Sequence, residues 1–308
     1  MRSEMAVSQH FMAWHCGPNL DNRYLYYWLQ SAKPQFERLA NGTTIKTIGL
    51  QYFKDLKLPV PRFGEQRAIA AALNSADVLL EGLTRLIDKK RDVKLAAMQQ
   101  LLTGQTRLPG FQGEWEVKRV GDFADCIAGG TPSTRVAGYW GGSIRWMNSG
   151  ELNLKRVDDV HGRITEAGLD SSSATILPAM CVLIGLAGQG KTRGTVAMNT
   201  VELCTNQSIG AILPNGSFVS EYLYYNLDAR YDELREMSTG SGGRGGLNLS
   251  IIKAIDVPFP TFAEQTAIAA VLSDMDAELT VLEAHFHKTR ALKQAMMQEL
   301  LTGRTRLV

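Results

Sequence analysis

The chain repeats part of itself, and this internal repeat constrains the fold more than any other feature of the sequence. LPVPRFGEQRAIAAALNSAD at residues 58–77 matches VPFPTFAEQTAIAAVLSDMD at residues 257–276. Pro59 and Pro258 set the offset at 258 − 59 = 199 residues. A repeated unit of this length predicts two similar structural halves, in contrast to a solenoid, which stacks short repeats of 20 to 50 residues.

The repeat extends beyond this core in both directions. Downstream, LLTGQTRL at 101–108 matches LLTGRTRL at 300–307 at the same offset. Upstream, YLYYWL at 24–29 matches YLYYNL at 222–227 at an offset of 198 residues. Residues from about 109 to 202 have no upstream counterpart. We therefore expect the first copy to lack the N-terminal part of the unit.

Each copy contains a long helical segment with an apolar seam. Apolar residues recur at alternating steps of four and three, which is typical of a coiled coil. The seam residues are Ile69, Leu73, Leu80, Leu83, Ile87 and Leu101 in the first copy, and Ile268, Leu272, Leu279, Leu282, Phe286 and Leu300 in the second. Gly104 and Gly303 follow the last seam leucines, as glycines do at helix C-termini. The seams predict two long paired helices.

The complete unit, at about 109–260, has a different pattern. MCVLIGL at 180–186, TVAMNTVEL at 195–203 and SIGAIL at 208–213 are short apolar or β-branched stretches between Gly, Asn and Ser turns. EYLYYNLDARYDELREM at 221–237 follows with a helical pattern. We predict an α+β globule with many loops.

Composition excludes several classes of protein. Thirty-three basic and thirty-one acidic residues leave a net charge of only +2, so overall charge does not indicate a nucleic-acid partner. No apolar run approaches the roughly 18 residues of a membrane helix, and the start lacks the apolar segment of a signal peptide. The four cysteines form no C-x-x-C pair, which favours reduced, mostly buried thiols over a zinc site or a disulfide framework. We expect a cytoplasmic protein without a metal site.

The stretch GLAGQGKT at 185–192 fits the phosphate-binding pattern G-x-x-x-x-G-K-[ST]. A phosphate-binding loop must lead into a helix, whose free amides hold the phosphates. Here RGTVAMNTVEL follows Thr192, and Gly194 and the β-branched residues favour a strand. A P-loop ATPase therefore stays only as a weak alternative. A loop between two strands suits the phosphates and base edges of DNA, which Lys, Arg and Gln bind.

Other polar segments with Gly, Ser or Asn are further candidates for DNA contact. They comprise TPSTR at 131–135, RWMNSGE at 145–151, Asn206 with Gln207, and STGSGGRGG at 238–246. A flexible surface loop is the competing reading for the last of these. The candidate DNA-contacting residues are Thr131, Ser133, Arg135, Asn148, Ser149, Gln189, Lys191, Thr192, Arg193, Asn206, Gln207 and Arg244.

With these motifs in their observed order, the chain resembles the specificity (S) subunits of Type I restriction-modification systems. The motifs are GGTPS at 129–133, GLAGQGK at 185–191, NQS at 206–208, PFPTFAEQTAIA at 258–269, and LLTG, which occurs twice. Each motif is short, but their order and the duplicated spacing are specific. The resemblance covers essentially the whole chain.

The resemblance implies an α+β fold in which globular target-recognition domains alternate with two long helices in an antiparallel coiled coil. It implies a remnant of the first recognition domain at 1–61, a spacer helix at 62–108, a complete second domain at 109–260 and a second spacer helix at 261–308. The helices would bind methyltransferase (modification) subunits, with the seam residues as the candidate interface both for these subunits and within the coiled coil, and a restriction-translocase subunit would join that complex. The S subunit would read double-stranded DNA without catalysis of its own and without a cofactor.

The chain departs from the family pattern in its shortened first domain, which leaves several alternatives open. The chain is a truncated form, a one-domain form that pairs with a second copy of itself, or a donor of recognition-domain sequence for recombination. In functional terms, a DNA-reading subunit competes with an assembly protein that recruits methyltransferase subunits without reading DNA. The P-loop ATPase is the enzymatic alternative.

Overall fold

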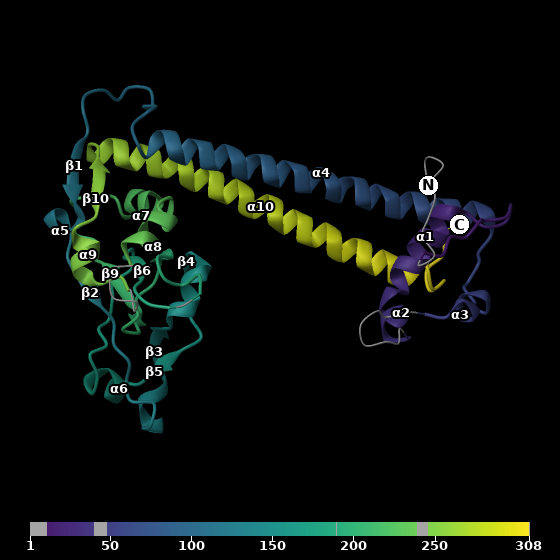
Figure 1. Ribbon diagram of the computed structural model, residues 1–308, viewed down its shortest axis with the longest axis horizontal. Helices are drawn as coiled ribbons and strands as arrows, with labels where there is room; N and C mark the ends of the chain where they lie inside the picture. Colours follow the sequence, from purple (N-terminus) through teal and green to yellow (C-terminus); the bar gives the residue numbers. More distant parts are fainter. Residues whose placement is uncertain (1–10, 40–47, 189, 239–245, 308) are drawn as a thin grey trace. The chain divides into compact units, whose positions relative to one another are not determined.

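The protein is seen in a computed structural model, which forms two compact units. The structure describes residues 11–39, 48–188, 190–238 and 246–307. Residues 1–90 and 278–308 form the first unit, and residues 91–277 form the second. Two helices of 39 residues each, α4 (Phe63–Leu101) and α10 (Phe262–Leu300), contribute to both units (Figure 1).

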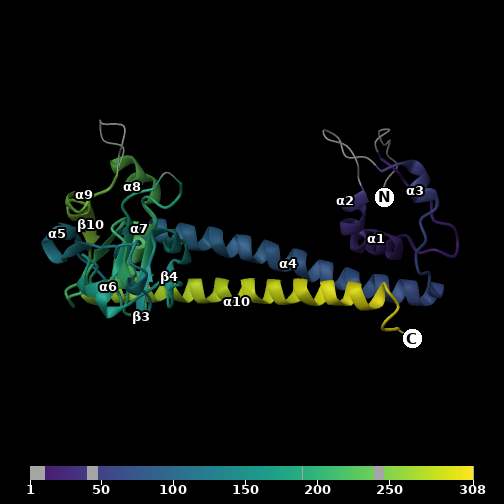
Figure 2. The same cartoon turned by 90° about the horizontal axis from the view of Figure 1, so that it is seen from below.

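Short helices make up the rest of the first unit. They are α1 (Asn22–Ser31), α2 (Lys33–Leu39) and α3 (Leu50–Lys54), and Figure 2 shows them on one side of the helix pair. The Asp21 side chain accepts hydrogen bonds from two backbone amides of the first turn and so caps α1. Tyr24 and Tyr27 of α1 pack with Ile69, Leu73 and Leu301 in the core of this unit.

The portions of α4 and α10 in the first unit run antiparallel. Ion pairs join Glu65 to Arg306, Asp77 to Lys293 and Lys90 to Glu278. Residue numbers rise along one helix as they fall along the other, which defines the antiparallel direction. The long helices and their pairing confirm the fold class that the apolar seams and the resemblance predicted.

The second unit contains three sheets. The largest has the strand order β2 (Cys126–Ala128), β9 (Ile209–Ile212), β6 (Val182–Gly185), β7 (Val196–Asn199) and β4 (Arg156–Val157). A second has the order β5 (Arg163–Ile164), β3 (Trp140–Met147) and β8 (Cys204–Thr205), and a third pairs β1 (Glu116–Arg119) with β10 (Asp256–Phe259). In the large sheet β4 and β7 are parallel, and the other neighbours are antiparallel.

Helical segments connect and cover these strands. They are α5 (Val120–Phe123), η1 (Ala137–Tyr139), η2 (Ser149–Leu154), α6 (Glu166–Asp170), α7 (Ser220–Asp228), α8 (Tyr231–Met237) and α9 (Leu249–Lys253). In Figure 1, β3 and β5 lie at the end of this unit that is away from its α4 and α10 segments.

The central strands β6, β7 and β9 are buried along their whole length, because apolar layers cover both faces of the sheet. On one face Val182 and Ile184 pack with Tyr222 and Tyr225 of α7. On the other face Leu183 belongs to a separate apolar cluster beneath β3 and η2. Continuous apolar runs are typical of strands with two covered faces.

Two predicted elements are divided in the structure. The predicted helix at 221–237 is two helices, α7 and α8, with a break at Ala229 and Arg230. Of the predicted strand at 195–203, only Val196–Asn199 (β7) is a strand; the chain then turns, and the two-residue β8 begins beyond the predicted stretch, at Cys204. Asn199 makes this turn, because its side-chain amide donates to the carbonyls of Pro178 and Val201 at 2.7 and 2.8 Å.

The cysteines are free thiols. Cys126, Cys181 and Cys204 are buried and Cys16 is half-buried, as the sequence predicted. Within residues 11–39, 48–188, 190–238 and 246–307, no helix is long and apolar enough to cross a membrane. In the same described ranges, no three His, Cys, Asp or Glu side chains gather in a way that could hold a metal ion.

Candidate nucleic-acid interface

Three of the predicted DNA-contacting segments emerge from one edge of the five-stranded sheet. Ala128 at the end of β2 lies opposite Gly210 near the start of β9. Gly185 at the end of β6 lies opposite Ile209, and Ile184 lies opposite Val196 at the start of β7. The loops that follow β2, connect β6 to β7 and precede β9 therefore share this edge.

Backbone hydrogen bonds join the loop after β2 to the end of β8, and the loop before β9 to the end of β3. Gly130 N donates to the Thr205 carbonyl at 2.8 Å, and Asn206 N donates to the Met147 carbonyl at 3.0 Å. The close approach explains Gly129, because a Cβ there would lie 2.2 Å from the Thr205 carbonyl oxygen. The backbone of these segments is thus fixed, as a recognition surface requires.

Two indoles hold the TPSTR segment in place. Trp146 Nε1 donates to the Gly130 carbonyl at 2.9 Å, and Trp140 Nε1 donates to the Ser133 carbonyl at 3.2 Å. The two rings pack edge to face with their centroids 5.0 Å apart. Because the indoles bind main-chain carbonyls, the Ser133 and Arg135 side chains remain exposed to solvent.

The glycine-rich loop between β6 and β7, which the structure describes at 186–188 and 190–195, forms a hairpin. Gly194 N donates to the Gly185 carbonyl at 2.9 Å and so closes the hairpin. From α8, Arg235 donates to the Gly190 carbonyl at 2.8 Å, and the Tyr231 hydroxyl donates to the Lys191 carbonyl at 3.1 Å. These contacts hold the backbone of the loop and leave the Lys191 side chain exposed.

The hairpin also bears on the nucleotide-binding alternative. The residues that follow Thr192 lead into β7, whereas a phosphate-binding loop leads into a helix. The geometry of this loop agrees with the interpretation from the sequence that GLAGQGKT is not a nucleoside triphosphate site.

Some of the predicted DNA-contacting side chains are engaged within the protein. Asn148 caps η2, because its Oδ1 accepts from Gly150 N at 2.8 Å, and its Nδ2 donates to Glu151. Asn206 Oδ1 accepts from the amide two residues later, at Ser208. Thr131 Oγ1 donates to Gln207 Oε1. Asn148 and Asn206 thus have a demonstrable role in shaping the loops.

The remaining predicted residues fall into two groups. Ser149, Thr192 and Arg193 are half-buried. Gln189 and Arg244 lie outside the residues that the structure describes.

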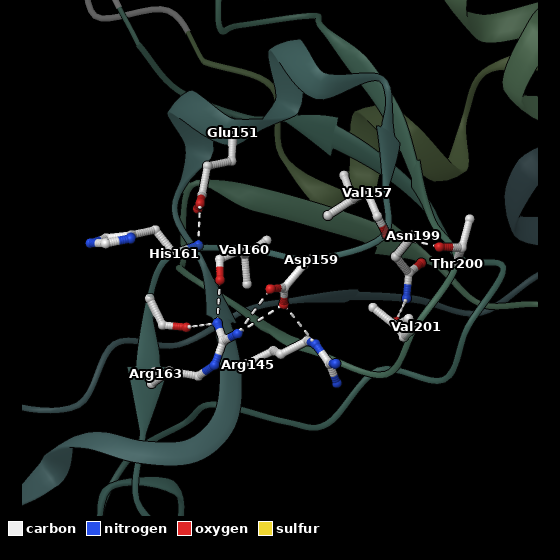
Figure 3. Close-up of polar contacts among 11 residues, drawn as sticks. Arg145, Glu151, Val157, Asp159, Val160, His161, Arg163, Asn199, Thr200 and Val201 are labelled. Carbon is white, nitrogen blue, oxygen red and sulfur yellow. Dashed lines mark hydrogen bonds and ion pairs between the residues drawn. The ribbon is translucent and has the colours of Figure 1, made fainter.

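A charged cluster near this surface was not singled out from the sequence. The Asp159 carboxylate accepts from Arg145 at 2.9 Å and from Arg163 at 2.8 Å, and Glu151 accepts from the backbone amide of His161 (Figure 3). The pKa of Asp159 is lowered below its usual value, mainly by the hydrogen bond from Arg145. The His161 side chain is exposed and points away from the cluster in Figure 3. The density of charged residues in RVDDVHGR at 156–163 is the sequence signal for this cluster.

The seam residues of the two long helices are mostly enclosed within their units. Eight are buried: Ile69, Leu73, Leu83, Ile87, Leu101, Ile268, Leu272 and Leu300. Four are half-buried: Leu80, Leu279, Leu282 and Phe286. The side chains that form the seam therefore offer little surface to another protein.

Polar loops on a fixed sheet edge, together with long helices, define a class of protein: a recognition module on a helical scaffold. The chain belongs to the Type I restriction modification DNA specificity domain family, whose model matches residues 1–89 and 112–289. The resemblance seen in the sequence motifs is thereby confirmed.

Two specificity subunits illustrate the relationship. The MjaIX specificity subunit of Methanocaldococcus jannaschii is 34% identical over 177 residues, covering 56% of this chain and 40% of that protein. The EcoR124I/EcoR124II specificity subunit of Escherichia coli is 24% identical over 264 residues, covering 82% of this chain and 63% of that protein. The chain thus spans less than two thirds of the length of either relative.

Solved structures show the same fold. The crystal structure of the S subunit of a Type I restriction-modification system from M. genitalium matches with a TM-score of 0.66 at 20% identity, covering 92% of this chain and 73% of that one. A structure that addresses complex assembly and conformational transition of the type I system matches with a TM-score of 0.58 at 18% identity, covering 93% and 72%. The predicted α+β fold with two long helices is confirmed.

Proposed function

We propose that this chain is a DNA sequence-specificity subunit that reads one half of a split target and docks methyltransferase subunits through its long helices. The observation that carries the proposal is the convergence of three polar loops on one edge of the large sheet, in a chain of this family. We propose no catalytic step for the chain itself, and we assign catalysis to its partner subunits.

The chemistry of the sheet edge supports DNA as the ligand. Lys191 and Arg135 are exposed cations on loops whose backbones are fixed, which suits contact with phosphates. Gln207 is exposed, and its Oε1 accepts a hydrogen bond from the Thr131 hydroxyl, so its Nε2 group is the one that would donate to a base. Amide and guanidinium groups of this kind distinguish base edges in the major groove.

The helix surfaces support protein docking. The seam side chains are mostly enclosed, but other apolar side chains of the first unit are exposed, namely Val78, Leu79 and Leu86 on α4 and Val281 and Leu292 on α10. Leu79 and Leu86 are seven residues apart, a spacing that keeps two side chains near one face of a helix. We assign the docking of methyltransferase subunits to these side chains, and the seam residues hold the helices together.

The test is DNA selection with the assembled complex. The chain is mixed with its cognate methyltransferase subunit and a random DNA library, and bound DNA is sequenced after several rounds at physiological salt. Enrichment of a short half-site, or of a palindromic split site if two copies assemble, is the expected result. A complex that assembles but retains DNA without sequence preference would identify an assembly protein instead.

A nucleotide titration addresses the enzymatic alternative. ATP is titrated into the chain alone and into its Lys191→Ala variant, and binding is followed by calorimetry. We expect no saturable binding to either protein, because β7 stands where a phosphate-binding loop needs a helix. A nucleotide site that Lys191→Ala abolishes would revive the ATPase.

A further inference from the structure

In the second unit, the indole of Trp115 fills a pocket that the helix termini create. Its Nε1 donates to the Glu264 carboxylate at 3.1 Å, and the Arg107 guanidinium lies 5.2 Å from the ring centroid. Gly104 packs against the ring, and a Cβ built on Gly104 would lie 3.2 Å from the nearest indole atom. Arg107 also forms an ion pair with Glu264, so the carboxylate, the guanidinium and the indole each contact the other two.

The chain on either side of Trp115 is fastened to the same unit. Before it, the Gly113 carbonyl accepts from Arg107 at 2.5 Å. After it, β1 pairs with β10 in antiparallel register, with Glu116 opposite Phe259 and Lys118 opposite Val257. Residues 113–119 are therefore an extended segment whose tryptophan anchors it in the pocket.

The repeat builds the same receptor in the first unit. Glu65 pairs with Arg306 at 2.5 Å, as Glu264 pairs with Arg107. The Tyr24 hydroxyl donates to the Pro59 carbonyl at 2.8 Å, and Tyr222 makes the equivalent bond, also of 2.8 Å, to the carbonyl of Pro258. Gly303 and Gly104 share the left-handed backbone, with φ of +74° and +73°.

In the first unit this receptor is open. It is a pocket of about 170 Å³ lined by Tyr24, Pro59, Val60, Pro61, Glu65, Leu300, Gly303 and Arg306. A Cβ built on Gly303 would meet nothing within 4 Å, whereas one on Gly104 would meet the indole. The Arg306 side chain is 61% exposed, and that of Arg107, which Trp115 covers, is 23% exposed.

Among the residues that the structure describes, this receptor has no strand partner either. At the offset of 199, residues 57–60 correspond to β10. Among the described residues, 57–60 pair with no strand, and Val60 is 52% exposed where its counterpart Phe259 is half-buried. The described part of the first unit thus presents a segment without a strand partner beside an open pocket, and unpaired backbone of this kind binds added strands.

We propose that the first unit takes up a tryptophan-bearing extended segment of a separate polypeptide, with the pattern of residues 113–119. The indole N–H would donate to Glu65, its ring would lie against Arg306, and the residues after it would pair antiparallel with 57–60. A second copy of this chain is the weaker candidate, because its own Trp115 is already bound to Glu264 and would have to be released. This inference concerns assembly and does not depend on DNA reading.

A labelled peptide tests the proposal on the intact chain. The probe is a fluorescein-labelled peptide of residues 109–122, PGFQGEWEVKRVGD, and binding is followed by fluorescence anisotropy. We expect saturable one-to-one binding that weakens at least about tenfold when the peptide carries Trp115→Ala. No saturable binding, or binding that is indifferent to the tryptophan, would overturn the proposal.

A matched pair of chain variants localises the binding. Arg306→Ala removes the cation of the open pocket, and we expect it to weaken binding of the peptide at least about tenfold. Arg304→Ala is the control. It removes the same charge two residues before Arg306, and the Arg304 side chain is 71% exposed. Equal affinities for the two variants would place the peptide elsewhere and contradict the assignment.

Register and the identity of the occupant are tested separately. In a Cys16→Ser background, Val60→Cys should form a disulfide faster with a peptide carrying Glu116→Cys than with one carrying Lys118→Cys, because Glu116 pairs with Phe259 in the second unit. Equal rates would contradict the predicted register. Light scattering of the chain alone should give a monomer, and a dimer that Arg306→Ala dissolves would assign the pocket to a second copy instead.

Discussion

The hydroxyl of Tyr225 donates a hydrogen bond of 2.7 Å to the carboxylate of Asp276, and the repeat reproduces this contact as Tyr27 and Asp77 at 2.8 Å. Each carboxylate also forms an ion pair with a lysine of the other long helix: Asp276 with Lys94, and Asp77 with Lys293. Burial, with a smaller contribution from Asp276, raises the pKa of Tyr225 to about 12. Both units thus contain the same polar group between the two long helices, which favours one register.

This polar group leads to a stability prediction. Tyr225→Phe should lower the free energy of unfolding by about 1 kcal/mol, since it removes a hydrogen bond to a carboxylate that is partly exposed. Urea unfolding measures the loss, and a double-mutant cycle with Lys94→Ala measures the coupling through Asp276. Tyr26→Phe is the control, because the Tyr26 side chain is 53% exposed. Equal stability of Tyr225→Phe and the unmodified chain would contradict the role of this bond.

The same tyrosine gives a dependence on pH with a defined sign. The pKa of Tyr225 is raised in the folded protein, so its contribution to stability is complete below the ordinary tyrosine pKa of about 10. That contribution is lost as the pH rises from about 10 through about 12. The stability difference between the unmodified chain and Tyr225→Phe should therefore shrink over this window in urea unfolding at stepped pH. A difference that grows with pH would show that the sign is wrong.

Gly194 closes the glycine-rich hairpin, and its replacement should disturb the loop. Its φ is +80°, and a Cβ would lie 3.1 Å from Cγ of Arg235, the residue that holds the Gly190 carbonyl. Gly194→Ala should destabilise the protein by about 1–2 kcal/mol in thermal unfolding. It should also speed tryptic cleavage after Lys191. Gly138→Ala is the control, because nothing lies within 4 Å of a Cβ there and its φ is not left-handed. Equal effects of the two substitutions would exclude a special role for Gly194.

The buried thiols should resist alkylation. Burial raises the pKa of Cys126 and Cys204 to about 11 and that of Cys181 to about 12. At pH 8 their thiolate fractions are on the order of one in a thousand or less, so the native protein should react first at half-buried Cys16. Treatment with iodoacetamide followed by peptide mass spectrometry measures the order, with the urea-unfolded chain as the control. Labelling of Cys181 as fast as Cys16 in the native protein would contradict it.

The sequence predicted the helical part of the fold well, because its signals are repeated and local. Seam leucines, glycines after the helices and the prolines before them each occur twice at one offset. The repeat also carries contacts, since Gln66 and Gln265 bind the carbonyls of Pro61 and Pro260 with equal distances of 2.9 Å. A duplicated sequence that folds the same way twice gives predictions an internal check.

The polar loops were less predictable, because tertiary contacts decide the role of each side chain. Asn148 and Asn206 look like base-reading amides in the sequence, yet each binds backbone groups of its own turn. The indoles of Trp140 and Trp146 hold the loop after β2, a contact across the chain that no local pattern specifies. Strands of two residues, such as β4 and β8, carry no periodicity from which to predict them.

Lys191 gives the most direct test of the candidate DNA interface. Its side chain is exposed while α8 holds its carbonyl, so Lys191→Ala removes a cation without removing a contact of the fold. Loss of one phosphate contact should weaken DNA binding by the assembled complex to a similar degree for every sequence, and should reduce the slope of log K against log salt by about 0.9. Anisotropy titrations from low to physiological salt measure both quantities. Lys54→Ala, on α3 of the first unit, removes the same charge from a residue outside the candidate interface and should leave the slope unchanged. If Lys191→Ala leaves affinity, selectivity and salt slope unchanged, the β6–β7 loop does not touch the DNA backbone, and the loops after β2 and before β9 must carry the contact.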